Sequence, residues 1–192
     1  EADIAELDFG REAIVLNPDE VRAHARDGVA PVLITGKIDK VSVSDGALSV
    51  HDYKTGRAFD SFEDATGPLA IKGHHYKNQL LFYKLLIEAS AYCRDILFPR
   101  LPIGKGLHDK RVGIGMIEFV EPVGPKKEIR CASLDLSDED ADRVRRLVIA
   151  VFKRIQALDF EMPKDIAEKM ARGDYKNDMD AILDFEERLL AE

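Results

Sequence analysis

The sequence of 192 residues is poor in cysteine and aromatic residues, with two cysteines, no tryptophan and an aromatic content of 7%. Cys93 and Cys131 are too far apart in the sequence to indicate a disulfide framework or the closely spaced ligand pairs of a zinc site. We therefore expect both to be small core residues.

Long apolar runs are also missing, because no segment approaches the roughly 20 residues of a membrane-spanning helix, and no signal-peptide pattern is present. We expect a cytoplasmic protein that does not enter a membrane. Its hydrophobic content of 45% is enough for one sizeable core. We expect a single domain over residues 1–192, with a core at 1–160 and a C-terminal helical extension at 161–192.

An excess of basic residues is lacking as well: 28 Lys and Arg stand against 36 Asp and Glu, for a formal net charge of −8. Contacts with phosphates dominate the affinity of proteins for DNA, so this balance argues against a strong, self-sufficient DNA-binding surface. An enzyme whose substrate is delivered by a partner remains compatible with it.

What is present begins with a β-hairpin in "LITGKIDKVSVSDGALSVHDYKTG", residues 33–56. Asp45-Gly46, between two alternating runs, is typical of a two-residue turn whose central residues both need positive φ. That turn sets the register: it places the apolar residues of the two strands on one face and Asp39 directly opposite Asp52 on the same face, with Cβ atoms about 4.5–5.5 Å apart.

Two carboxylates at that spacing repel each other unless a cation lies between them. A divalent ion removes the conflict, and carboxylate oxygens suit Mg²⁺ or Mn²⁺. Lys54, two residues after Asp52, lies on the same face and could hold a phosphate oxygen or an attacking water. The alternative is that the strand ends flare into solvent and the acids are simply exposed.

A helix is expected over residues 74–92, "HHYKNQLLFYKLLIEASAY", from its apolar periodicity. Gln79 and Tyr83 are four residues apart and therefore share a face of this helix. A glutamine among leucines needs a hydrogen-bonding partner if it is buried. These two side chains either belong to a site or tie the helix to the sheet.

Three segments, "GKID" (36–39), "VHDYKTG" (50–56) and "QLLFY" (79–83), occur in this order. Together they resemble the RecB-like branch of the PD-(D/E)XK nuclease superfamily, the nuclease domain fused to UvrD/RecB-type helicases. That branch carries a Gly-x-x-Asp motif, an Asp-x-Lys-Thr-Gly motif and then a Gln-x-x-x-Tyr motif on a helix. The resemblance implies an α/β fold with a restriction-endonuclease-like core, in which a mixed central β-sheet is flanked by helices.

The resemblance also implies the roles of the site residues. Asp39, Asp52 and Lys54 would be catalytic. Asp39, Asp52 and the backbone carbonyl of Tyr53 would bind Mg²⁺ or Mn²⁺, with no other cofactor. The residues that would line the cleft and contact the nucleic-acid strand are Gln79 and Tyr83.

Some features depart from the family pattern. Ile38 stands where the superfamily usually has proline, as is ordinary for the RecB-like branch. Relatives often have an upstream helix with a metal-binding histidine, and some have a four-cysteine iron–sulfur cluster; two cysteines cannot form that cluster within this chain. Glu6, in "AELDFG", is a further candidate acid. The chain begins at Glu1 without room for the upstream helix, so we expect a fragment of a larger protein that is inactive when isolated.

The function implied is metal-dependent hydrolysis of DNA phosphodiester bonds, exonuclease-like, as the nuclease module of a helicase–nuclease or a recombination and repair protein. Its partners would be DNA and the helicase domains of the parent protein or of a partner subunit. The alternative is a catalytically inactive, nuclease-like module that binds DNA or acts as a scaffold for a helicase.

The remaining sequence predicts two further strands, at residues 111–120 and 126–136, and two helices. The first helix runs from a Ser137 cap to about Leu158, and the second covers residues 179–192. The glycine-containing segment "PIGKGLHDKR", at 102–111, lacks the full phosphate-loop pattern, so we expect no nucleotide site there.

Overall fold

A computed structural model describes residues 2–10, 12–26, 28–44, 47–100, 111–125 and 127–191. The chain forms two compact units, Glu1–Ala141 and Asp142–Glu192. The division falls inside a helix rather than between residues 160 and 161. The description of the chain as a single domain stays a prediction.

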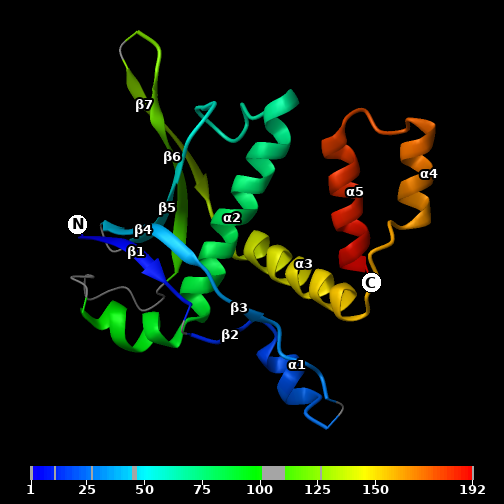
Figure 1. The fold of residues 1–192 in the computed structure, drawn as a ribbon. Helices are drawn as coiled ribbons and strands as arrows, with labels where there is room; N and C mark the ends of the chain where they lie inside the picture. Colours follow the sequence, from blue (N-terminus) through cyan, green and yellow to red (C-terminus); the bar gives the residue numbers. More distant parts are fainter. Residues whose placement is uncertain are drawn as a thin grey trace. The chain divides into compact units, whose positions relative to one another are not determined.

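The first unit is built on a five-stranded sheet with the strand order β1-β4-β5-β6-β7 (Figure 1). Neighbouring strands are antiparallel except for β5 and β6, which are parallel. A parallel pair needs a long crossover connection, and helix α2 lies in that connection. This mixed sheet with flanking helices confirms the predicted α/β, restriction-endonuclease-like fold. The strands are β1 (Ala2–Asp8), β4 (Lys37–Ser44), β5 (Ala47–Lys54), β6 (Val112–Val123) and β7 (Glu128–Asp135).

The other elements are shorter strands and helices. A two-stranded sheet pairs β2 with β3. The bounds are β2 (Ile14–Val15), β3 (Leu33–Ile34), α1 (Pro18–Ala23), α2 (Ala70–Ala89), α3 (Asp138–Gln156), α4 (Lys164–Arg172) and α5 (Asp178–Ala191), with single helical turns at Gly67–Leu69, Cys93–Leu97 and Phe98–Arg100. Among the described residues, no helix has the length and apolar character that crossing a membrane would require.

The hairpin of β4 and β5 has the predicted register. The facing pairs are Ser44 with Ala47, Val43 with Leu48, Ser42 with Ser49, Val41 with Val50, and Lys40 with His51. The turn residues Asp45 and Gly46 lie outside the described residues. The pairing of the two strands therefore confirms the predicted register.

The core of the first unit lies between the sheet and α2, which packs on β5 and β6. Val41 and Val50 are fully buried on this face. A Cβ at Gly115 would lie 2.9 Å from Cδ1 of Leu80, so the helix approaches β6 closely at a residue without a side chain. On the opposite face of the sheet, Ile38 is also fully buried.

The predicted elements differ from the observed ones mainly in their limits. Helix α2 begins at Ala70, four residues before the predicted start. Ser137 precedes α3 and its hydroxyl accepts a hydrogen bond from the backbone N–H of Asp140, which confirms the predicted cap. Cys93 is buried as expected, but Cys131 is exposed, so its prediction as a core residue is wrong. Residues 101–110, which hold most of the glycine-containing segment, lie outside the described residues.

The second unit consists of the rest of α3 with α4 and α5. Lys169 and Tyr175 both bond to the Asp184 carboxylate, at 2.7 and 2.5 Å, and so join α4 and the segment after it to α5. Val151 and Ile155 of α3 are 40% and 50% exposed. They line an apolar groove of about 480 Å³ within this unit.

Candidate active site

The candidate site lies where β4 and β5 separate. The pairing between the described residues of these strands ends at Lys40 and His51, after which β4 continues beside β1 and β5 beside β6. Asp39 and Asp52 are the next residues, on the face that the buried valines occupy. The backbone N–H of Tyr53 donates a hydrogen bond to Oδ2 of Asp39 at 2.9 Å. This bond to a side chain follows the last backbone pair between the two strands.

The Asp52 carboxylate is buried, with 2% of the residue exposed. Its Oδ1 accepts hydrogen bonds from Gln79 Nε2 at 2.9 Å and from the Tyr83 hydroxyl at 2.8 Å. Gln79 also donates to the Tyr83 hydroxyl at 2.7 Å. Gln79 and Tyr83 therefore meet Asp52 as one hydrogen-bonded group, as their four-residue spacing predicts.

The second oxygen of Asp52 is in a different state. Nζ of Lys54 lies 2.6 Å from Oδ2, yet Oδ2 has no hydrogen-bond partner among the described residues. The charge of Asp52 is therefore paired with that of Lys54, although the ammonium group is not aligned for a hydrogen bond to Oδ2. Such a buried oxygen is a functional candidate.

The Tyr83 phenol lies among these charges. Burial, the hydrogen bond to Asp52, and the negative charges of Asp52 and Asp39 raise its pKa well above the ordinary value. Tyr83 therefore stays neutral at neutral pH and remains a hydrogen-bond donor to Asp52.

Asp39 and Asp52 offer the carboxylate oxygens that a hard divalent cation prefers, although one side chain is exposed and the other is buried. Asp39 is exposed and Asp52 is buried, with an oxygen that lacks a hydrogen-bond donor. Mg²⁺ commonly binds through one or two carboxylates and keeps several waters, so two acids suffice for it. The described part of the chain has no group of three or more His, Cys, Asp or Glu side chains placed to hold a metal. Glu6 instead pairs with Lys37 at 2.9 Å.

Sequence reasoning missed two neighbours of the site on α2. Lys54 Nζ lies 5.1 Å from the centre of the Tyr76 ring, and Lys72 Nζ lies 5.5 Å from the same centre. Tyr76 precedes Gln79 by three residues and Lys72 precedes it by seven, so helical spacing would have placed both on the Gln79 face.

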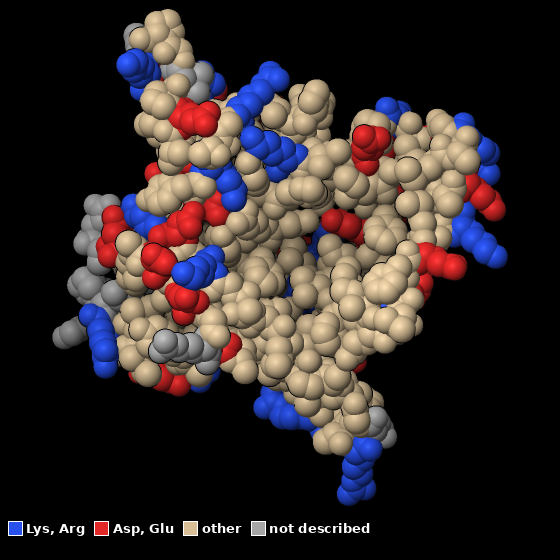
Figure 2. Space-filling model, in the orientation of Figure 1, with Lys and Arg blue, Asp and Glu red and all other residues tan. Residues whose placement is uncertain are grey.

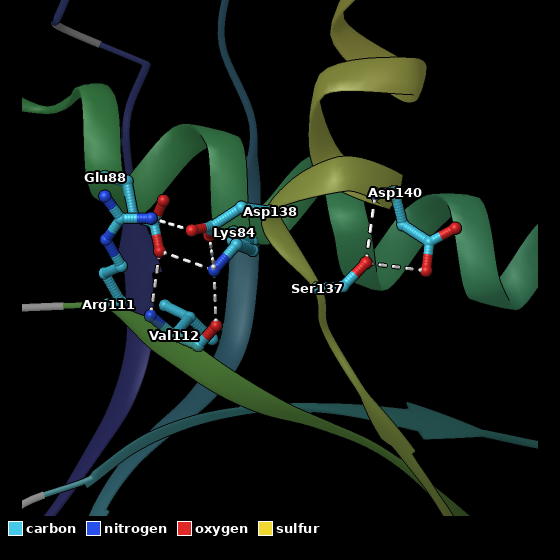
Figure 3. Close-up of polar contacts among 7 residues, drawn as sticks. All are labelled: Lys84, Glu88, Arg111, Val112, Ser137, Asp138 and Asp140. Atoms are coloured by element: carbon cyan, nitrogen blue, oxygen red, sulfur yellow. Dashed lines mark hydrogen bonds and ion pairs between the residues drawn. The ribbon is translucent and has the colours of Figure 1, made fainter.

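A second polar cluster on α2, around Lys84, was also missed (Figure 3). Lys84 is 2% exposed, and its ammonium lies 2.8 Å from Glu88, 2.7 Å from the Val112 carbonyl and 3.1 Å from Asp138. Asp138 also pairs with Arg111. This cluster joins α2 to the beginnings of β6 and α3.

The sequence was compared with curated proteins and with models of protein families. Comparison with curated proteins gave no match. Residues 3–176 match the family model described as the PD-(D/E)XK nuclease superfamily, and the matched range includes Asp39, Asp52, Lys54, Gln79 and Tyr83. The mixed sheet and α2 bring together Asp52, Lys54, Gln79 and Tyr83. Because the family match also covers most of its length, the chain belongs to the PD-(D/E)XK nuclease superfamily.

Proposed function

We propose that this chain is a metal-dependent DNA nuclease of the RecB-like branch, exonuclease-like, that acts with helicase domains in DNA recombination or repair. Membership of a nuclease superfamily supports the hydrolytic activity. The observation that carries the proposal is the buried Asp52 carboxylate, with Oδ1 held by α2 and Oδ2 left without an aligned donor beside Lys54.

Asp39 and Asp52, with the backbone carbonyl of Tyr53, would hold Mg²⁺ or Mn²⁺. When bound, the ion supplies Lewis acidity and neutralises negative charge at the phosphate. Asp52 is suited to this role because Gln79 and Tyr83 fix one oxygen and so orient the other.

Lys54 would act on the substrate directly. Its side chain is 21% exposed and its ammonium reaches Oδ2 of Asp52, so it lies between the buried carboxylate and solvent. From there it orients the attacking water or stabilises the charge that develops on the phosphate. Gln79 and Tyr83 complete the lining of the site and contact the strand.

The acidic character of the chain supports a partner that delivers DNA. The formal net charge is −8, and Figure 2 shows acidic and basic side chains of the described residues interspersed on the face drawn. Affinity for DNA depends largely on phosphate contacts, so a partner that brings the strand to the site is the expected arrangement. A cytoplasmic location with DNA and helicase domains as partners belongs to this proposal.

The test is cleavage of end-labelled linear and closed circular DNA by the wild type, Asp52→Asn and Lys54→Ala, each assayed together with the helicase domains proposed as partners, with Mg²⁺ or Mn²⁺ and with EDTA. We expect the wild type to cleave linear DNA only when the metal is present. Each substitution should lower the rate by about 10³-fold, which corresponds to about 4 kcal/mol of transition-state stabilisation. Asp52→Asn should leave the fold as stable as before or more so, because it removes a buried charge.

Metal binding has a readout independent of cleavage. At an ion concentration tenfold above Kd, Mg²⁺ should stabilise the wild type by about 1.4 kcal/mol, measured as a rise in Tm, and should not stabilise Asp52→Asn. Lys54→Ala should retain the rise. A wild-type rate unaffected by EDTA, or Asp52→Asn and Lys54→Ala rates equal to the wild-type rate, would refute these roles.

A catalytically inactive, nuclease-like module that binds DNA or acts as a scaffold for a helicase is the second candidate. The observation in its favour is that Lys54 already lies 2.6 Å from Oδ2 of Asp52, so that an internal ion pair occupies the site. No cleavage by the wild type and no metal-dependent rise in Tm, with DNA binding intact, would favour this second candidate.

A further inference from the structure

One face of α2 continues beyond the predicted motif. Lys72, Tyr76, Gln79 and Tyr83 follow one another at intervals of four, three and four residues and so lie along one side of the helix. Gln79 and Tyr83 donate hydrogen bonds to Asp52, while the ammonium group of Lys54 lies over the ring of Tyr76. Lys72 is the next side chain along this face.

Aromatic rings hold Lys72 in place. Its ammonium lies 5.5 Å from the centre of the Tyr76 ring and 5.9 Å from that of Phe119. These rings pack with Phe59, whose centre lies 6.2 Å from Tyr76 and 5.1 Å from Phe119. A cation over aromatic faces is stabilised without a neutralising acid, so it keeps its charge for a ligand.

The charge partners of the lysines on α2 differ. Lys77 pairs with Asp140 and Lys84 with Glu88, and off the helix Lys54 pairs with Asp52. Lys72 instead donates to the backbone carbonyl of Arg57 at 3.2 Å, and no carboxylate among the described residues forms an ion pair with it. In a chain of net charge −8, Lys72 is a cation beside the candidate active site that no acidic side chain in the described part of the chain neutralises.

The backbone beside Lys72 contains a glycine that its conformation requires. Gly56, two residues after Lys54, has a φ of +93°, and a Cβ there would lie 3.7 Å from Nζ of Lys72, which is an ordinary contact distance. A side chain at this position would be strained by the positive φ, and glycine avoids that strain.

We propose that Lys72 binds a backbone phosphate of the nucleic-acid strand, next to the phosphate that Lys54 and Asp52 act on. The proposal rests on the proposed nuclease function and extends it to a strand-binding residue that the family motifs do not include. Tyr76 is the positioning residue, since its ring contacts both ammonium groups. A contact with a phosphate is independent of the base sequence.

The experiment measures binding of a fluorescent single-stranded oligonucleotide by anisotropy, in EDTA, over a series of salt concentrations. The variants are Lys72→Met, Lys72→Arg and the matched control Lys77→Met, which removes the same charge from the same helix. Losing one phosphate contact should lower the slope of log K against log salt by about 0.7 for a single strand. We expect this change for Lys72→Met only, equally for oligonucleotides of different sequence, with Lys72→Arg close to the wild type.

The outcomes separate this inference from the function on which it rests. Equal salt slopes for Lys72→Met and the wild type, in a protein that binds the oligonucleotide and loses cleavage through Asp52→Asn, would overturn the role of Lys72 alone. The same slope change in Lys77→Met would also overturn it, because the effect would then be one of net charge. A wild type that neither binds nor cleaves DNA would overturn both proposals.

Discussion

Two polar clusters contact helix α2, one around Asp52 and one around Lys84, and they differ in how completely their buried charge is satisfied. The Lys84 ammonium donates hydrogen bonds to Glu88 and to the Val112 carbonyl and forms a further ion pair with Asp138 (Figure 3). Asp52 has one oxygen with two donors and one oxygen with no aligned donor among the described residues.

The Lys84 cluster and the Asp52 cluster are expected to serve different purposes, one in folding and the other in the reaction. A buried charge that is fully paired joins elements, and removing it leaves its partners without bonds, so it should affect folding. A buried charge with an unsatisfied oxygen costs free energy in the folded state and is retained where it serves a ligand or a reaction. Lys84 should therefore matter for stability, and Asp52 for chemistry.

The largest effect on stability is expected for Lys84→Ala. The substitution empties a buried site and removes the charge partner of Glu88, so it should lower the free energy of unfolding by about 3 kcal/mol. Urea unfolding measures this change. Lys84→Met keeps most of the side-chain volume and should cost on the order of 1 kcal/mol.

The comparison also predicts what Lys84→Ala leaves unchanged. Cleavage per folded molecule, at a temperature where the variant is fully folded, should equal that of the wild type. If stability is unchanged but cleavage is lost, the Lys84 cluster is part of the active site and the distinction between the two clusters is wrong.

A smaller effect is expected for Tyr83→Phe, which removes one of the two donors to Asp52 Oδ1 while Gln79 remains. The loss of this hydrogen bond should reduce stability by about 1.5 kcal/mol at neutral pH. Cleavage should also decrease, because Asp52 is held less firmly. Unfolding and cleavage measured on one preparation check both expectations.

The same variant gives a test by pH. The folded-state pKa of Tyr83 is raised, so the folded state keeps a proton that the unfolded state loses above pH of about 10. The stabilising contribution of Tyr83 is fully present below that pH and decreases as the pH rises toward the folded-state pKa. The wild type should therefore lose more stability than Tyr83→Phe above pH of about 10. Parallel losses would show that the Tyr83 proton is not coupled to folding.

The smallest effect is expected for Asp138→Asn in the Lys84 cluster. The Asp138 side chain is 57% exposed, and its ion pairs with Lys84 and Arg111 are screened by solvent. It lies in the first turn of α3, where an acid adds a modest favourable interaction with the helix dipole. We expect a loss of about 0.5 kcal/mol in urea unfolding that decreases with added salt. A loss as large as that of Lys84→Ala would mean that Asp138, rather than Glu88, is the main partner of Lys84.

The local features of the fold and of the site could be predicted from the order of the residues. The spacing of residues around Asp45-Gly46 predicted the register of β4 and β5, and the four-residue interval placed Gln79 and Tyr83 on one face of α2. Ser137 predicted the start of α3. These features depend on residues close in the chain, whose geometry follows from the periods of strands and helices.

The tertiary structure decided the burial and the long-range partners. It buries Asp52 while it exposes Asp39, because the pairing of β4 and β5 ends at these residues and α2 packs on β5 and β6. It likewise buries Lys84, whose charge the sequence alone would place in solvent, and exposes Cys131. Burial depends on which distant segments pack together, and here the parallel pairing of β5 with β6 and the packing of α2 on both strands decide it.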